Sequence, residues 1–333
     1  MNKTNAVILA GDRKASKLVD NQNKAFLKIR GIPCIVYVVR AFLGSEYVGN
    51  IVVVGPASRL KDTLSEYGIY PDSRVKIVEQ KENLIENGKA GYVASLEGIP
   101  DDLEFKFLDR EKYGEVPVVG SSCDIPLITP QEIDEFILRA NPEKYDFCIG
   151  LCEEEVLSYY YPDAENPGIR LTYFSLIEGS YRVNNLDMIK PLKIERLRYI
   201  ERMYEIRYQK QFLNMVKLFL EILFTGRGLA RTLRCALKLH LARICFDRRY
   251  DGLYKALKNS VGIDSAFDSI SRVLGARGSY AVTRYGGAAL DIDHPEDKII
   301  IEKMYDRWME YQNSIQPRDP NTRPDMDKKR KEE

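Results

Sequence analysis

The stretch Val116-Pro-Val-Val-Gly-Ser-Ser-Cys-Asp-Ile-Pro-Leu-Ile-Thr-Pro130 decides the predicted fold. A short apolar run ends in small residues, presents the carboxylate of Asp124, and turns at Pro126 toward a helix that begins near Pro130. Thr129 is the predicted N-cap of that helix, with Pro130 at its first position. The pattern predicts a buried strand whose C-terminal end holds a carboxylate at a sheet edge, where open α/β sheets bind ligands. The alternative is that Asp124 is only a turn residue before proline.

Strands and helices alternate along the first half of the chain at the spacing of βαβ units. This alternation predicts an α/β fold, a Rossmann-like three-layer sandwich around a mostly parallel sheet. A first buried strand at 5–10 is followed by a polar stretch that ends at Asn23-Lys24. Further strands are predicted over 50–55, 75–80, 116–122 and 146–152, and helices over 58–66, over 83–97 and from the turn at 30–33 to Phe42.

The second half is less regular and divides the chain into three parts. Residues 169–177 alternate as a strand would, 181–184 follow after a turn, and the pattern later predicts a helix at 265–274, a strand at 279–283 and a final helix at 295–312. We therefore expect a core formed by 1–190 and 262–314, a helical insertion at 191–261, and a disordered tail at 315–333, which is rich in proline and charge.

The composition is that of a soluble globular protein. The 333 residues are 44% hydrophobic and 30% charged, with a formal net charge of +1. This balance argues against a nucleic-acid binder driven by overall charge. Six cysteines without paired CxxC spacing and only two histidines argue against a zinc site. The N-terminus leads straight into a strand with no signal peptide, so we expect reduced thiols and a cytoplasmic protein.

The near-neutral total hides a basic segment within the insertion. Residues 190–260 contain 17 Lys and Arg against 6 Asp and Glu. Within them, Phe212–Phe224 is apolar except for a narrow polar stripe, but its 13 residues are too few to span a bilayer, which needs about 20. Two interpretations stay open: a helical hairpin packed on the core or on a second subunit, as in a homodimer, or a basic amphipathic element on an anionic membrane surface.

Three stretches together resemble the MobA-like nucleotidyltransferases of the GT-A-like fold. Val7-Ile-Leu-Ala-Gly11, followed by Asn23-Lys-Ala-Phe-Leu-Lys-Ile-Arg-Gly-Ile-Pro33, is similar to the family's Leu-Ala-Gly start, phosphate-side lysine and Gly-Lys-Pro turn. Ser122-Cys-Asp-Ile-Pro-Leu-Ile-Thr-Pro130 is similar to its Gly-Asp-x-Pro-Leu segment, and Asp291-Ile-Asp-His-Pro-Glu-Asp297 to its closing Asp-x-Asp-Thr-Pro-Glu-Asp. The combination, in this order and spacing, is more specific than any one motif.

The resemblance implies a Mg²⁺-dependent enzyme that joins an NTP to a phosphorylated acceptor, such as a sugar or polyol phosphate, and releases pyrophosphate. Attack at the α-phosphorus needs cations and hydrogen-bond donors around the triphosphate. The implied phosphate-binding groups are the backbone amides of Ala10, Gly11 and Asp12 and the side chains of Lys24 and Arg13. Asp124 and Asp293 are the implied Mg²⁺ ligands, because Mg²⁺ prefers carboxylates, waters and phosphates.

The same resemblance implies positions for the base and the acceptor. The segment 80–89 matches the place where the family contacts the base, which makes Asn83 and Asn87 candidates. Arg182, Asn184 and Asn185 are candidates for binding the phosphate or hydroxyls of the acceptor, with a structural role as their alternative.

The chain also departs from the family pattern at three positions, and two other functions stay open. Gly11 is not followed by a second glycine, Asn23 stands where the family has proline, and Cys123 stands where it has glycine. One alternative is a GT-A glycosyltransferase that uses a nucleotide sugar; the other is a non-catalytic module for nucleotide binding or membrane recruitment. Without the resemblance, Lys24 is interpreted as a solvated surface lysine, and the alternative role of Asp293, equally open to Asp291, is to cap the last helix.

Overall fold

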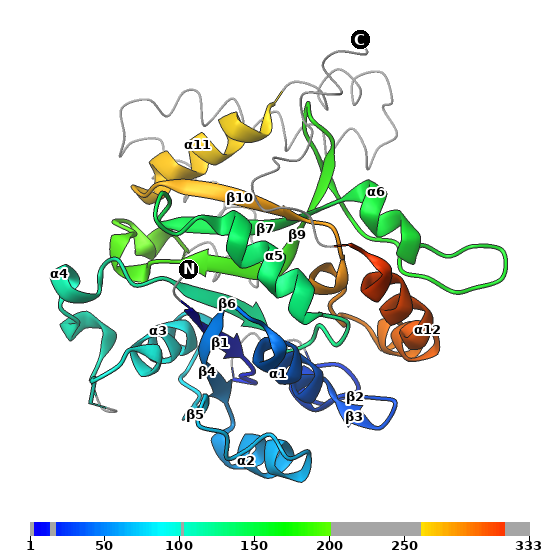
Figure 1. Cartoon of the computed structure of the whole chain (residues 1–333), viewed down its shortest axis with the longest axis horizontal. Helices are drawn as coiled ribbons and strands as arrows, with labels where there is room; N and C mark the ends of the chain where they lie inside the picture. The colour runs from blue at the N-terminus through cyan, green and yellow to red at the C-terminus, as the bar shows by residue number, and fades with distance from the viewer. Residues whose placement is uncertain (1–2, 14–17, 101–102, 201–260, 317–333) are drawn as a thin grey trace.

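The protein, seen as a computed structural model, is described over residues 3–13, 18–100, 103–200 and 261–316. In this part of the chain, eight strands form one sheet in the order β10-β7-β9-β6-β1-β4-β5, with β8 beside β9 (Figure 1). Strand β9 runs antiparallel to β6 and β7, and the pairs β1–β4, β1–β6, β4–β5 and β7–β10 are parallel. The strands are β1 Thr4–Leu9, β4 Val48–Gly55, β5 Val75–Glu79, β6 Val118–Ser122, β7 Phe147–Glu153, β8 Phe174–Ser175, β9 Ser180–Ile189 and β10 Gly278–Thr283, and a separate hairpin pairs β2 Lys28–Ile29 with β3 Ile32–Pro33.

Helices cover both faces of the sheet, which confirms the three-layer α/β prediction. Figure 1 shows α3 on one side of β1 and β4, and α1 on the other. The α-helices are α1 Cys34–Gly44, α2 Ala57–Glu66, α3 Leu84–Ser95, α4 Arg110–Tyr113, α5 Pro130–Ala140, α6 Glu154–Leu157, α11 Ile263–Leu274 and α12 Pro295–Ser314. The short 3₁₀ turns are η1 Lys24–Phe26, η2 Phe105–Phe107, η3 Ser158–Tyr160, η4 Pro191–Lys193 and η5 Gly287–Ala289.

The two faces of the central strands explain this layering. On β1, Val7 packs in a cluster with the α3 residues Tyr92 and Val93, whereas Ile8 packs in the opposite cluster with Phe42 of α1. A strand that is apolar on both faces is typical of a parallel sheet covered on both sides.

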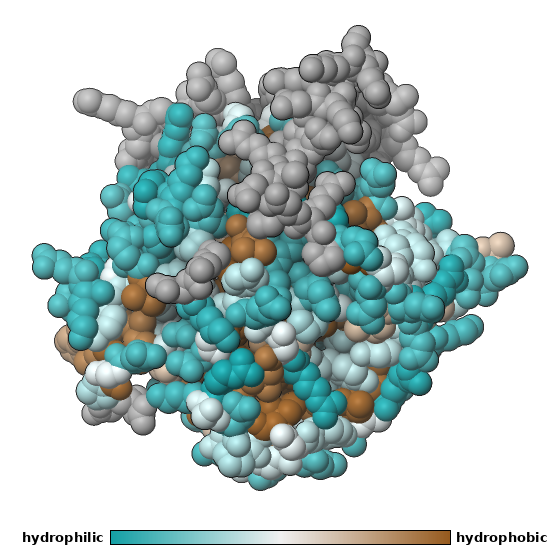
Figure 2. Space-filling model, viewed as in Figure 1, coloured by the Kyte–Doolittle hydropathy of each residue, from teal (hydrophilic) through white to brown (hydrophobic). Residues whose placement is uncertain are grey.

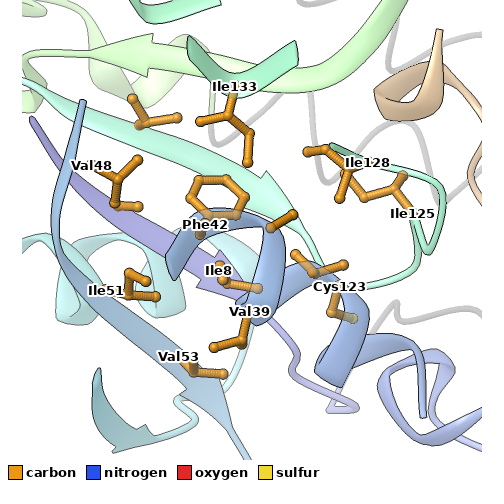
Figure 3. Packing of buried hydrophobic residues seen from close by; sticks show 14 of the residues in the cluster. Ile8, Val39, Phe42, Val48, Ile51, Val53, Cys123, Ile125, Ile128 and Ile133 are labelled. Atoms are coloured by element: carbon orange, nitrogen blue, oxygen red, sulfur yellow. The ribbon is translucent and has the colours of Figure 1, made fainter. Parts of the chain in front are cut away.

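The segment after β6 is part of the larger of these clusters. Figure 3 shows Cys123, Ile125 and Ile128 beside Phe42 of α1 and Ile133 of α5. Ile125 and Ile128 are almost completely buried. Because apolar side chains on both sides of Asp124 are fixed in the core, the carboxylate is presented from a rigid support.

Helix α12 brings the C-terminal part of the described chain onto the same side of the molecule. Its residues Ile301, Met304 and Trp308 share a buried cluster with Leu290 and Ile292 of the segment before it. Leu127, which follows Asp124, belongs to the same cluster, so this packing ties α12 to the segment after β6.

Most predicted elements are confirmed, and one is wrong. Thr129 caps α5, accepting a hydrogen bond from the Glu132 amide at 3.2 Å. The strand expected at 169–177 is reduced to Phe174–Ser175, because Leu171 and Tyr173 pack against the α12 cluster instead of entering a ladder. The expected short strand at 181–184 extends to Ile189 as β9.

The insertion and the tail lie almost entirely outside the described residues. This includes Phe212–Phe224 and the basic helices, whose predicted roles are therefore untested. Within the described ranges, no helix combines the length and the apolar character that crossing a bilayer requires. Figure 2 shows a face that is mostly hydrophilic where it is coloured, with apolar residues in small, separate patches.

Candidate functional site

Three segments far apart in sequence converge at the carboxyl ends of β1 and β6. The Lys24 ammonium lies 2.8 Å from Oδ2 of Asp124 and 2.8 Å from Oδ1 of Asp293. The side chains of Lys24 and Asp124 are 14% and 10% exposed, whereas that of Asp293 is 46% exposed. The structure thus brings together three residues that the sequence predicted for one site, and Asp293 forms its open side.

Asn23 fixes the backbone that carries Lys24. Its side-chain amide donates to the Ala10 carbonyl at 2.9 Å, and its carbonyl oxygen accepts from the Ala25 amide at 2.9 Å as the N-cap of η1. Asn23 is itself buried. The residue that departs from the family's proline therefore ties Lys24 to the end of β1.

The charges around Lys24 keep it protonated. Burial lowers the pKa of this ammonium, but the carboxylates of Asp124 and Asp293 outweigh burial, and the pKa is raised overall. The nearby thiols of Cys34 and Cys123 have raised pKa values because they are buried, with Asp124 adding to the effect. They are neutral thiols at neutral pH, which makes them poor nucleophiles.

Asp293 is carried by residues 284–293, which connect β10 to α12 and are called the strap below. The strap is bonded directly to the segment after β6, since the Ile292 amide donates to the Asp124 carbonyl at 3.1 Å. At its end, the Asp297 carboxylate accepts from the amides of Asp293 at 3.0 Å and His294 at 2.7 Å. Asp297 thus satisfies the two amides directly before α12, and the Asp293 carboxylate faces Lys24.

Two carboxylates of α5 hold the middle of the strap. Glu132 is fully buried; its Oε2 accepts from the Ala288 amide at 2.9 Å and its Oε1 from the Thr283 hydroxyl at 3.1 Å. Glu135 accepts two hydrogen bonds from Arg284, one from the backbone amide at 3.2 Å and one from the side-chain Nε at 2.9 Å. Burial raises the pKa of Glu132 to about 7, against the hydrogen bonds that lower it.

The predicted acceptor residues of β9 hold the strap from its other side. Arg182 donates to the Ala289 carbonyl at 3.1 Å and pairs with Asp291 at 2.9 Å. Asn185 donates to the Ala288 carbonyl at 3.0 Å, and the buried Asn184 donates to Thr283 at 3.2 Å. All three have structural partners. Burial, and then Asp124, raise the pKa of Asp291, whose partner is Arg182.

The first loop is held by amide side chains. Gln80 accepts from the Asp12 amide at 2.8 Å and donates to the Asp12 carboxylate at 2.7 Å. A Cβ at Gly11 would lie 2.5 Å from Nδ2 of Asn87, so a side chain at this position would force Asn87 to shift. Sequence reasoning missed Gln80, although this polar residue lies at the C-terminal end of a predicted parallel strand, where α/β sheets bind ligands.

Most of the groups predicted to bind the phosphates and the base already have hydrogen-bond partners within the chain. The amides of Ala10 and Asp12 are already bonded, to Val54 and Gln80, so binding phosphate would require them to exchange partners. Asn83 is the N-cap of α3, accepting from the Glu86 amide at 2.9 Å. Asn87 is buried and accepts from the Lys81 amide at 2.6 Å.

A cleft of about 950 Å³ opens beside this loop, between β5, α3 and the residues 99–100 and 103–106. Arg13, Gln80 and Asn83 line it, and Arg13 is 53% exposed with its guanidinium 3.4 Å from Glu79. A cavity of this size suits a small-molecule ligand.

The convergent carboxylates suit a hard cation. Asp124 and Asp293 already share one positively charged partner, so their oxygens point at a common position. No cluster of three or more acidic, thiol or imidazole groups able to hold a metal occurs in the described ranges. A cation here would complete its shell with water and substrate oxygens, which is the usual arrangement for Mg²⁺.

The chain resembles known proteins in both sequence and fold. The family model of the MobA-like NTP transferase domain matches residues 6–240. A hypothetical transferase from Thermus thermophilus has a TM-score of 0.58 at 21% identity, covering 89% of this chain and 99% of that one.

Two further solved structures are more distant. A 4-diphosphocytidyl-2C-methyl-D-erythritol synthase from Anaerococcus prevotii has a TM-score of 0.45 at 12% identity, covering 92% of this chain and 97% of that one. A CMP:2-keto-3-deoxy-manno-octonic acid synthetase complexed with CTP has a TM-score of 0.44 at 9% identity, covering 92% and 99%. No curated protein matches the chain.

The family match includes the ends of β1 and β6, with Lys24 and Asp124. The strap that supplies Asp293 lies beyond the matched residues but completes the same cluster. The chain belongs to the MobA-like NTP transferase family.

Proposed function

We propose that the chain is a Mg²⁺-dependent nucleotidyltransferase that joins an NTP to a sugar or polyol phosphate and releases pyrophosphate. The observation that carries this proposal is the contact of one ammonium, Lys24, with two carboxylates from separate segments, Asp124 and Asp293. Such a cluster supplies both signs of charge that a triphosphate and its metal require.

The reaction needs no protein nucleophile. An oxygen of the acceptor phosphate attacks the α-phosphorus, the bond from that phosphorus to the bridging oxygen of the β-phosphate breaks, and pyrophosphate leaves with that oxygen. The chain must orient the two phosphates and neutralise the charge that develops. The neutral, buried thiols of Cys34 and Cys123 are consistent with direct transfer.

Each charged residue has a defined role in this proposal. Asp124 and Asp293 would hold the Mg²⁺ ion, which supplies Lewis-acid polarisation of the phosphate oxygens when bound. Lys24 would neutralise the α-phosphate, and Arg13, which is exposed at the mouth of the cleft, would contact the β- and γ-phosphates. The base would lie in the cleft beside Gln80 and α3.

The acceptor would bind on the strap side, against β9. Because Arg182 already pairs with Asp291, we propose that it acts by fixing the strap, and that an acceptor phosphate would have to compete for its guanidinium. We further propose a cytoplasmic location, and contact of the 191–261 insertion with either a second subunit or an anionic membrane surface.

The test is pyrophosphate release with each of the four NTPs and Mg²⁺ against a panel of sugar and inositol phosphates. Wild type is compared with Asp124→Asn and with a matched surface variant, Asp62→Asn on α2. We expect release that needs both substrates, that is retained in the surface variant, and that is lost in Asp124→Asn. Thermal stabilisation by an NTP, with no release across the panel, would favour the non-catalytic nucleotide-binding module instead.

A further inference from the structure

We propose that Lys24 and the divalent cation are alternative occupants of one cation site, so that metal and NTP bind cooperatively. This inference rests on the proposed function and adds a rule for how the site loads. The metal can bind between Asp124 and Asp293 only when the Lys24 ammonium leaves, and the triphosphate gives that ammonium a new partner.

The geometry places the ammonium where a bridging cation would lie. Lys24 Nζ is 2.8 Å from one oxygen of each carboxylate. A Mg²⁺ ion binds oxygen ligands at about 2.1 Å, closer than an ammonium can approach, and it carries twice the charge. The two cations therefore cannot occupy the space between these oxygens together.

The backbone that carries Lys24 is fixed, so an exchange must come from its side chain. Asn23 bonds to Ala10 and to Ala25, and Ala25 and Phe26 are buried in the core. Exchange therefore requires rotation about the side-chain bonds of Lys24 alone. Asp293, at 46% exposure, leaves a side of the pair open to solvent, through which a cation can enter.

The energetics give the exchange its direction. Without a cation, the two carboxylates would repel each other at short range in a partly buried site, so Lys24 holds them in position before substrate arrives. A metal ion on its own must break two charge-assisted hydrogen bonds of this ammonium. An NTP removes that cost by binding the displaced ammonium, and by linkage the metal must then favour NTP binding by the same factor.

The decisive experiment measures Mn²⁺ binding without nucleotide, by electron paramagnetic resonance at pH 8. Wild type is compared with Lys24→Met, which keeps the length of the side chain but removes its charge. The matched control is Lys28→Met, an exposed position on β2 that loses the same charge. We expect Lys24→Met to bind Mn²⁺ at least about tenfold more tightly than both wild type and the control.

A double variant, Lys24→Met with Asp124→Asn, shows where that ion binds. We expect this double variant to lose the tighter Mn²⁺ binding of Lys24→Met. Equal affinity of Lys24→Met and wild type, or a gain that persists in the double variant, would overturn the proposal. The Mn²⁺ measurement uses no substrate, so it is independent of the pyrophosphate assay. If Lys24→Met binds Mn²⁺ more tightly but the wild type releases no pyrophosphate with any NTP, the proposed function is refuted and the shared cation site is not.

A measurement on wild type covers the case in which Lys24→Met does not fold. Lysine acetylation by acetic anhydride is followed by peptide mass spectrometry with and without saturating Mg²⁺. We expect the labelling of Lys24 to rise several-fold with Mg²⁺ while Lys28 is unchanged. Labelling of Lys24 that stays the same, or falls, when Mg²⁺ saturates the protein would contradict the exchange.

Discussion

The two sides of the site are supported by different chemistry. The first loop, at Gly11 and Asp12, is held by the uncharged amide of Gln80, and the amide of Asn87 lies beside Gly11. The strap that carries Asp293 is held by carboxylates, with Glu132 at its middle and Asp297 at its end. Amide supports add no negative charge where a triphosphate would bind. Carboxylate supports bond the backbone amides of the strap strongly, but they make its position depend on protonation.

The first prediction tests whether the strap contributes one essential carboxylate or two. Asp124→Asn and Asp293→Asn each remove a charge that faces Lys24, and we expect losses of about 10³-fold in pyrophosphate release. Asp291→Asn removes the partner of Arg182 instead, and we expect a loss of about tenfold or less. Initial-rate assays at saturating Mg²⁺ check this order, and equal losses in all three would contradict the assignment of Asp293 as the metal ligand.

The second prediction removes the central support of the strap. Glu132→Ala leaves the Ala288 amide and the Thr283 hydroxyl without their acceptor inside the core, and we expect a loss of about 3 kcal/mol in the free energy of unfolding. Glu132→Gln keeps the shape and one acceptor oxygen, so its loss should be about 1 kcal/mol or less. Urea titration at pH 5 compares the variants; a Gln variant as unstable as the Ala variant would contradict the assignment of this stabilisation to the two hydrogen bonds.

The third prediction uses the raised pKa of the same carboxyl group. Burial lifts the pKa of Glu132 from 4.5 to about 7, so the folded state holds its proton at a higher pH than the unfolded state does. This group's stabilisation is fully present below pH 4.5 and is lost as the pH rises to about 7, a change of about 3 kcal/mol. Wild type loses this stability as the pH rises from 4.5 to about 7, whereas Glu132→Gln does not titrate at this position. We therefore expect thermal unfolding to show Glu132→Gln gaining stability relative to wild type, by this amount, over that pH range. A difference that stays constant with pH would contradict it.

The smallest effect is expected at the first loop. Gly11→Ala places a methyl group 2.5 Å from Nδ2 of Asn87, which can shift at a cost of about 1–2 kcal/mol. We expect weaker NTP binding by calorimetry, and partial recovery when Asn87→Ala makes room. Gly88→Ala is the control for glycine replacement, because its added Cβ would meet no atom within 4 Å. Failure of Asn87→Ala to restore binding would show that the loop does not depend on this contact.

The sequence predicted the parts of this molecule that follow from local pattern. The apolar run before Asp124 and the Thr129-Pro130 cap contain their own structural signals, and both form as expected. The resemblance placed Lys24, Asp124 and Asp293 in one site although they are far apart in sequence. Their convergence follows from strand order, because β1 and β6 are neighbours and their carboxyl ends meet at one edge.

Other features depend on long-range partners that no local pattern encodes. Glu132 reads as an ordinary acidic residue in the first turn of a helix, yet it is fully buried because the strap passes over α5. Arg182 and Asn185 are sequence-based candidates for acceptor binding with a structural role as the alternative, and in the structure they bond to the strap. The strand expected over 169–177 failed for the same reason, since α12 competes for its apolar side chains.

The most direct test of the account follows the fate of the individual phosphates of the NTP that supports release in the panel assay. Parallel reactions use that NTP labelled at the α-phosphorus or at the γ-phosphorus, with Mg²⁺ and the active acceptor. The account predicts that the α-label enters the acceptor product, that the γ-label leaves as pyrophosphate, and that both transfers are lost in Asp124→Asn. A γ-label in the acceptor product, or transfer that survives in Asp124→Asn, would contradict nucleotidyl transfer at this site.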